Sequence, residues 1–289
     1  AEVVAEIGMF DSALVSFKSK YGVEVPSFIV LYEEAANWDP ANPAGVVPDV
    51  SHRESRAFIR QVWPQFDFTY ANGTTNGAVT PGSMDINGDA DSGDTLVLNG
   101  PECLVFFLGG VCETNVVDNQ GALRTSPPNP SVGDPIAWWN PLGFSPNPQN
   151  PFARGGNRVE PFYQFDGGEN GRLTDVFPAA GDSMPEYLDS LPGQQRPYIY
   201  LSSYGGRGYR PVGANGTPGD IDDEIGGIAG IYYSDVGLTT PQNPNSYQLI
   251  SPGGDFAYGG GGYYNGDTVG SGRSDEVDNI TNFAKGRLN

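Results

Sequence analysis

Carboxylates close a glycine-rich stretch near the carboxyl end of the chain. The stretch SPGGDFAYGGGGYYNGDTVGSGRSDEVDNITNF begins at Ser251, and acids gather late in it at Asp275, Glu276 and Asp278. Glycine in such number loses much conformational entropy on ordering and offers no side chain for burial. The stretch is therefore expected to stay disordered unless another interaction orders it. The acids suggest a divalent cation in that role, because negative charge attracts such ions.

A second acidic stretch, MDINGDADSGD, alternates oxygen-bearing side chains with other residues. These side chains are Asp85, Asn87, Asp89 and Asp91. The spacing begins like an EF-hand loop. It then fails, since Ala90 replaces the turn glycine and Leu96 stands where a bidentate Glu is needed. An isolated calcium loop of the dockerin-like kind and a plain polar turn both remain open.

The charge of the chain restricts its partners. Its 289 residues carry a formal net charge of -20, which repels the phosphates of nucleic acids and anionic lipids and attracts divalent cations. We therefore expect no nucleic-acid partner. The chain also holds 41 Gly and 25 Pro with 12% aromatic residues, a composition that indicates an ordered protein rich in loops.

The residues of common enzymes do not form their usual patterns. The segment GDSMP imitates the opening of one esterase family, but the only histidine, His52, lies upstream on what we expect to be a helix surface. One histidine and two cysteines match no usual zinc spacing. We expect no enzyme and no catalytic residue. A glycosidase with two catalytic carboxylates stays an alternative, because its carboxylates are recognised by their distance in space and not by their spacing in the sequence. Cys103 and Cys112 either form one disulfide in an oxidising compartment or stay free.

The elements that must position these residues begin with an amphipathic helix over residues 1–22. Its apolar stripe has alternating spacings of four and three, at Val3, Ile7, Phe10, Leu14, Phe17 and Tyr21. Gly22 suits the left-handed position after a helix. No capping residue precedes the stripe, so we expect the helix to continue upstream.

Further elements follow in an order typical of an α+β fold. SHRESRAFIRQVWP predicts a helix over 51–64, and GPECLVFFLGG favours a short helix over a strand. Residues 115–193 predict long loops pinned by aromatic side chains. Three strands are expected in RPYIYLSS (196–203), GIAGIYYS (227–234) and SYQLIS (246–251). Helices that precede antiparallel strands define the expected fold class.

The segment SALVSFKSKYGVEVPS resembles type IV pilin-like proteins, especially the major pseudopilins of type II secretion, where it follows the apolar half of the N-terminal helix. SRAFIRQVWP, GPECLVFFLGG, RPYIYLSSYGG, NPNSYQLISPGGD and DNITNF, in that order, resemble a large-loop version of this family from planctomycete-type bacteria. The resemblance implies an N-terminal helix packed on an antiparallel sheet, with residues 1–22 as the lower half of that helix and 23–289 as one globular head.

The same resemblance implies a structural role. The protein would be a subunit of a type IV pilus or a secretion pseudopilus, in the cell envelope or outside the cell, and would assemble with its own copies and other pilin-like subunits. A missing apolar segment upstream would be its only membrane contact. Within the filament, polymer contacts would come from the helix stripe Val3, Ile7, Phe10, Leu14 and Phe17 and from loops of the head.

Major pseudopilins bind calcium in a C-terminal loop, and the resemblance places the corresponding ligands in LISPGGD and DEVDN. They would be Leu249, Ser251, Asp255, Asp275 and Asp278. This chain departs from the family by the insertion AYGGGGYYNGDTVGSGR between the two acidic halves. The alternative function is a secreted, calcium-dependent carbohydrate-binding adhesin in which Trp138 and Trp139 stack on sugar rings.

Overall fold

The computed structural model describes residues 1–39, 49–75, 78–88, 92–117, 123–124, 138–154, 156–167, 171–176, 184–209, 230–284 and 286–289. These residues form two compact units, each built from separate stretches of the chain. The first unit comprises Ala1–Phe28, Asn99–Leu104 and Glu186–Asn289, and the second Ile29–Leu98 and Val105–Pro185. This division differs from the single head expected over 23–289. The chain passes between the units within the helix α3, Gly100–Gly109.

The first unit contains the predicted N-terminal helix, α1, Glu2–Tyr21. Gly22 ends it at φ 73°, and its N–H donates to Lys18 O at 2.8 Å, which satisfies one of the last carbonyls. Three antiparallel strands form the sheet of this unit in the order β10 (Ile199–Ser202), β12 (Tyr247–Ser251) and β14 (Ile280–Thr281). The helix and the first two strands confirm predictions made from local patterns.

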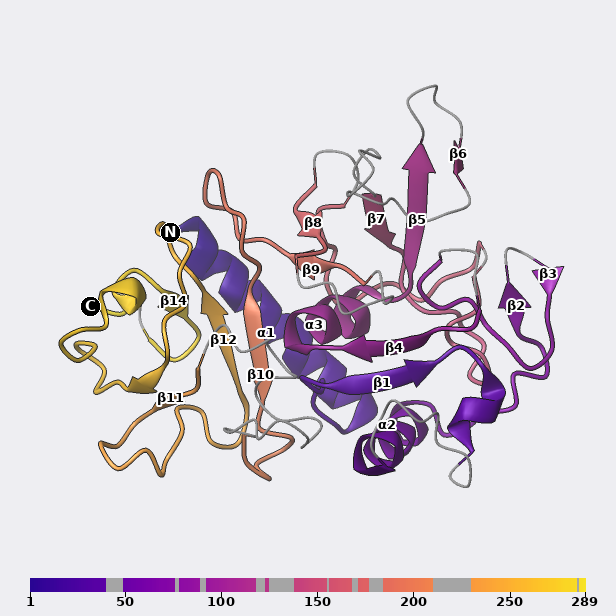
Figure 1. Cartoon of the computed structure of the whole chain (residues 1–289), viewed down its shortest axis with the longest axis horizontal. Helices are drawn as coiled ribbons and strands as arrows, with labels where there is room; N and C mark the ends of the chain where they lie inside the picture. Colours follow the sequence, from indigo (N-terminus) through magenta and orange to yellow (C-terminus); the bar gives the residue numbers. More distant parts are fainter. Residues whose placement is uncertain are drawn as a thin grey trace. The chain divides into compact units, whose positions relative to one another are not determined.

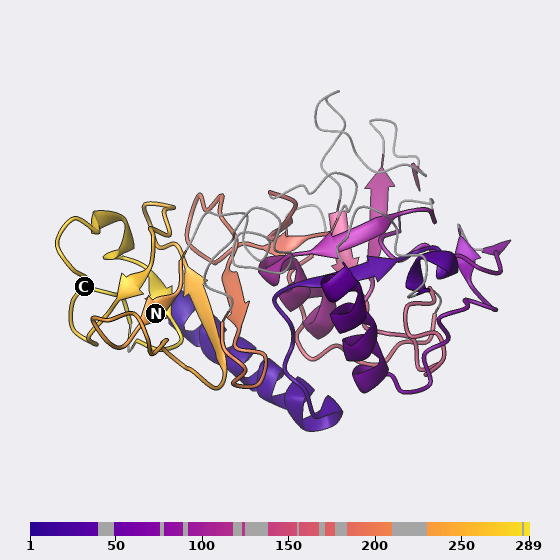
Figure 2. The same cartoon turned by 60° about the horizontal axis from the view of Figure 1, so that its bottom comes forward.

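The helix α1 lies along this sheet, and both views show it beside β10 and β12 (Figures 1 and 2). Phe10 meets the ring of Tyr198 edge to face at 5.2 Å, and the Tyr198 hydroxyl donates to Glu6 Oε2 at 2.6 Å. Tyr247 Oη donates to Asp11 Oδ1 at 2.8 Å. Each fully buried apolar side chain of the helix contributes about 1.5–3 kcal/mol to this packing.

The apolar stripe of α1 is used inside the subunit, which corrects one expectation. Val3, Ile7, Phe10, Leu14 and Phe17 are each at most 4% exposed. They cannot also form polymer contacts while the unit is folded, so their assignment as a filament interface is wrong for this structure. The exposed apolar side chains of α1 are instead Val4, Met9 and Val15.

The glycine-rich segment after β12 contains two short elements, β13 (Gly262–Tyr263) and the 3₁₀ turn η3 (Ser274–Glu276). Two further short strands of this unit, β9 (Glu186–Tyr187) and β11 (Tyr232–Tyr233), precede β12 in the chain. β11 and β13 pair in parallel, unlike the antiparallel arrangement expected throughout. Only Tyr232 and Tyr233 of the strand expected over 227–234 are in a strand, and residues 227–229 lie outside the described residues.

The second unit is built on small antiparallel pairings. β1 (Ile29–Tyr32) pairs with β4 (Thr95–Leu98), and α2 (Asp49–Val62) contacts β1. The remaining elements are η1 (Ala35–Trp38), the pair β2 (Thr74–Thr75) and β3 (Ala78–Val79), the sheet β6 (Leu123–Arg124), β5 (Cys112–Val117) and β7 (Trp138–Pro141), and β8 (Leu173–Thr174). The helices α2 and α3 confirm the two predicted from SHRESRAFIRQVWP and GPECLVFFLGG.

Aromatic rings fill the core of the second unit. Trp63 meets Phe152 at 5.3 Å and Phe144 at 5.0 Å, both near perpendicular, a geometry that such rings favour. His52 is fully buried, with Nδ1 3.3 Å from the Tyr32 hydroxyl, so its expected place on a helix surface is wrong. A histidine is amphipathic, and the sequence periodicity did not separate the two faces at this position.

Both cysteines are free and buried, Cys103 in the first unit and Cys112 in the second. The disulfide left open by the sequence is therefore not formed in this structure. Burial raises the pKa of the Cys112 thiol to about 12, so it remains protonated and unreactive. Within the described part of the chain, no helix is both long and apolar enough to cross a membrane.

Candidate metal centre

Two of the predicted acids of the C-terminal loop, Asp255 and Asp278, lie together. Asp278 Oδ2 accepts the N–H of Gly254 at 2.6 Å and that of Asp255 at 3.2 Å, which brings the segment after β12 against the segment before β14. Gly253 makes this approach feasible: it has φ 70°, and a Cβ there would lie 2.5 Å from the main-chain oxygen of Asp278. The glycines therefore let two acidic segments touch.

The electrostatics of this loop are unfavourable without a counter-ion. Partial burial, followed by the charges of Asp278 and Asp275, raises the pKa of Asp255 above its ordinary value. The hydrogen bond from Ala257 N–H to Asp255 Oδ1, at 2.9 Å, acts in the opposite direction. The charges of Asp278 and Asp275 thus act against ionisation of Asp255, and a divalent cation between the carboxylates would offset that effect.

Two shielded acceptors in the same segment add to this account. Neither Asp278 Oδ1 nor Asn279 Oδ1 has a hydrogen-bond partner among the described residues, and both atoms are screened from solvent. The amide of Asn279 is held in place because its Nδ2 donates to Tyr258 O at 2.8 Å. Buried oxygens of this kind are normally satisfied by a donor, a water or an ion. The carboxylates and these oxygens fit a calcium ion by chemistry.

The other predicted ligands have different contacts. The Leu249 carbonyl accepts the N–H of Asn282 at 3.2 Å, and the Ser251 hydroxyl donates to the buried carboxylate of Asp189. The Ser251 hydroxyl also accepts the N–H of Gly253 at 3.3 Å. The roles of Leu249 and Ser251 as ligands stay a prediction. Glu276, the middle acid of the run, is buried and ion-paired with Arg273.

The second predicted calcium loop is partly described. Asp85 and Asn87 are 3% and 1% exposed, and Asp89 and Asp91 lie outside the described residues. Asp85 Oδ1 accepts the N–H of Gly88 at 2.5 Å, and Asn87 Nδ2 donates to Asp94 Oδ2 at 3.3 Å. The segment 85–88 is thus a tight polar turn, and calcium binding there stays a prediction.

Sequence reasoning missed Glu33, which lies at the centre of this turn and is fully buried. Its carboxylate accepts the N–H of Ile86 at 2.6 Å through Oε1 and the N–H of Asp94 at 3.3 Å through Oε2. Burial, aided by the charges of Asp85 and Asp94, raises the pKa of Glu33 to about 8. The available signal was an acid directly after the apolar run IVLY, at the end of a strand.

Two further tests concern metal ligation by side chains alone and sugar binding by the two tryptophans. Within the described ranges, no three side chains of His, Cys, Asp or Glu form a group that could hold a metal ion by themselves. This criterion concerns those side chains alone, whereas Ca²⁺ also uses amide and main-chain oxygens and water. Trp139 is 6% exposed and cannot stack on a sugar, and only the backbone of Trp138 is described.

Comparison of the chain with protein-family models, with curated proteins and with solved structures finds no match.

Proposed function

We propose that the chain is a structural subunit of a pilin-like or pseudopilus-like filament outside the cytoplasm, stabilised by calcium. The observation that carries the proposal is the packing of the long helix α1 across the antiparallel sheet β10–β12–β14. The role is architectural rather than catalytic. Partners are further copies of the chain and related subunits, and the expected place is the bacterial envelope or its exterior.

The outward side of α1 supports the proposed assembly. Val4, Met9 and Val15 are 44%, 52% and 63% exposed on a helix whose other side is packed on the sheet. Near them, Gly8 has no atom within 4 Å of the place a Cβ would occupy, which leaves room for a neighbouring side chain. Small residues of this kind let helices approach closely. The polymer contact is therefore assigned to this outward side.

Calcium contributes through the C-terminal loop. A cation bound by Asp255, Asp275 and Asp278 offsets their repulsion and orders the loop that follows β12. A subunit exposed to the millimolar calcium outside a cell needs only a weak site, in the range of about 10⁻⁴–10⁻³ M.

Cysteine cross-linking in native cells tests the filament. Val15→Cys, expressed in the organism from the natural gene, should give a ladder of covalent oligomers in envelope and surface fractions when a short thiol cross-linker is added. The control is Asn157→Cys, an exposed position in the second unit. The wild-type chain should give no ladder because Cys103 and Cys112 are buried. Monomer alone from Val15→Cys, together with the absence of fibres in electron micrographs, would contradict the proposal.

A further inference from the structure

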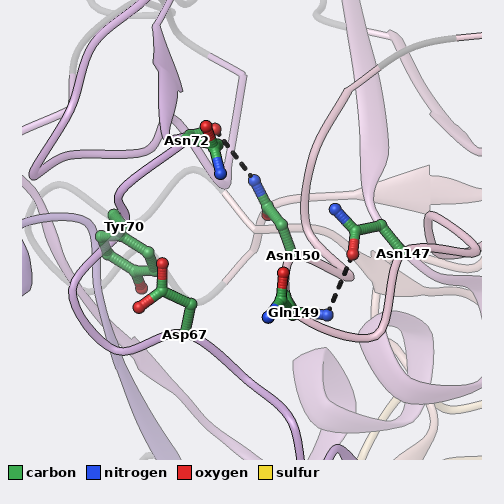
Figure 3. A pocket seen from close by; sticks show the side chains of 6 residues that line it. All are labelled: Asp67, Tyr70, Asn72, Asn147, Gln149 and Asn150. Atoms are coloured by element: carbon green, nitrogen blue, oxygen red, sulfur yellow. Dashed lines mark hydrogen bonds between the residues drawn. The ribbon is translucent and has the colours of Figure 1, made fainter.

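A small polar cavity in the second unit lies between two loop segments, 67–72 and 147–150, which face each other across it (Figure 3). Its lining is one carboxylate, four amide side chains and one tyrosine: Asp67, Asn72, Asn147, Gln149, Asn150 and Tyr70. About 10 Å³ is open to the centre of a water-sized particle, so a single water or a monatomic ion fits.

Two hydrogen bonds join the facing segments and fix the cavity. The N–H of Asp67 donates to Gln149 O at 2.9 Å, and Asn150 Nδ2 donates to Asn72 O at 3.3 Å. The second bond also decides the orientation of the Asn150 amide, since a flipped amide would set its oxygen against the Asn72 carbonyl. The oxygen of Asn150 is therefore the atom left for a ligand.

That oxygen has no donor to accept from. Asn150 is 7% exposed, and its Oδ1 is screened from solvent and has no hydrogen-bond partner among the described residues. A buried acceptor in this state costs about 1–3 kcal/mol unless a donor or a cation reaches it. The cavity in front of it is the place from which such a species would act.

The charge of the cavity favours a cation. Burial alone would raise the pKa of Asp67, but hydrogen bonds from Thr69 and Ala71 outweigh it and lower the pKa, so this side chain stays ionised. Asp67 Oδ2 accepts one N–H, that of Ala71 at 2.9 Å, and keeps a lone pair for a ligand. No imidazole or thiol lines the cavity, which disfavours zinc and other softer metals.

We propose that this cavity binds one calcium ion, with Asn150 Oδ1 and the Asp67 carboxylate as the principal ligands and amide oxygens or water completing the shell. Calcium accepts irregular shells of carboxylate and amide oxygens, whereas magnesium requires a near-octahedral shell and retains its water. One carboxylate makes a weak site, in the range of about 10⁻⁴–10⁻³ M. The ion would fasten segment 67–72 to segment 147–150, independently of the C-terminal loop and of any filament.

Diffraction tests the site directly. Crystals of the full chain soaked in millimolar calcium, and separately in terbium as its anomalous substitute, should show an ion within bonding distance of Asn150 Oδ1. Asn150→Ala should remove that ion, while Asn157→Ala, an exposed asparagine in the same unit, should retain it. Density for a water alone at saturating metal would overturn the proposal.

A second variant covers the case in which Asn150→Ala folds poorly. Asn150→Asp keeps a side-chain oxygen and adds a charge beside Asp67, but it loses the hydrogen bond to Asn72 O. Its melting temperature should therefore fall in EGTA, and calcium should raise it more steeply than that of the wild type without restoring it in full. The same comparison in an Asp278→Asn background separates this cavity from the C-terminal loop. A melting temperature of Asn150→Asp that calcium raises no more than that of the wild type would overturn the assignment.

Discussion

The molecule has two acidic turns, one around Glu33 and one around Asp278, and they differ in how the fold satisfies their carboxylate oxygens. In the second unit, the buried Glu33 accepts main-chain N–H groups from Ile86 and Asp94, so the folded chain already satisfies its oxygens. In the first unit, Asp278 satisfies one oxygen in the same way, but its Oδ1 has no partner among the described residues. A cation would therefore satisfy this oxygen at the C-terminal loop, whereas the Glu33 oxygens already have partners.

Burial divides the two turns further. Glu33 is fully buried and its pKa is raised to about 8, whereas Asp255 is exposed. A buried carboxyl can be neutralised by a proton at ordinary pH, while exposed carboxylates keep their charge and attract a cation. We therefore expect the Glu33 turn to respond mainly to pH and the Asp278 loop mainly to calcium.

The largest effect on stability is expected from removing the Glu33 carboxylate. Glu33→Ala leaves the N–H groups of Ile86, Asn87 and Asp94 without their acceptor, and each buried unsatisfied donor costs about 1–3 kcal/mol. The free energy of unfolding, measured by urea denaturation, should fall by about 3 kcal/mol or more. The neighbouring Glu34→Ala, at an exposed position, should change it by about 0.5 kcal/mol or less. Equal effects of the two variants would refute the assigned role of Glu33.

The next effect is the response of the same turn to pH. Because the pKa of Glu33 is raised to about 8, the folded state holds a proton that the unfolded state loses near pH 4.5. Stability contributed by this group is complete below about pH 4.5 and is lost as the pH rises towards 8, by up to about 1.4 kcal/mol for each pH unit.

Glu33→Gln isolates this slope, since the amide keeps an acceptor oxygen and does not titrate. Subtracting its stability curve from that of the wild type, both measured between pH 5 and pH 8 in EGTA, removes shared contributions such as that of Asp175, whose pKa burial raises to about 6. A difference curve that is flat, or that rises with pH, would show that Glu33 is ionised throughout.

The sequence predicts the regular elements better than it predicts the two acidic turns. The helix α1 and the strands β10 and β12 follow from local periodicity and residue type, so the sequence predicts them within a few residues. The meeting of Asp255 and Asp278 was anticipated only through a resemblance, because 23 positions separate them. Glu33 and Asp94 are 61 positions apart. Their meeting is decided by the register of β1 and β4, in which Tyr32 faces Thr95, and no local pattern encodes that register.

Burial was the other property that the sequence did not reveal. The stripe of α1 was correctly identified as apolar, but an apolar stripe fits a polymer contact as well as the subunit's own sheet. Two tyrosines distinguish these alternatives, because Tyr198, directly before β10, donates to Glu6 of the helix, and Tyr247 of β12 donates to Asp11. Such long-range hydrogen bonds depend on the assembled fold and cannot be inferred from spacing.

The smallest expected effect sharpens the calcium side of the comparison. Calcium at about ten times its dissociation constant should stabilise the wild-type chain by about 1.4 kcal/mol through the Asp278 loop, as measured by melting with and without EGTA. Asp278→Asn should remove the loop's share of this gain and leave only the share of the cavity lined by Asp67 and Asn150. Its stability in EGTA should be nearly unchanged, because the amide oxygen can still accept from Gly254 and Asp255 and the repulsion on Asp255 disappears.

Asp267→Asn serves as the matched control, since Asp267 is an exposed aspartate in the same glycine-rich segment and outside the predicted ligand set. It should retain the full response to calcium. The pattern matters more than its size: if Asp278→Asn destabilised the chain equally with and without calcium, Asp278 would act only as an acceptor for main-chain N–H groups. The two acidic turns would then differ in burial alone, and calcium would have no part in the C-terminal loop.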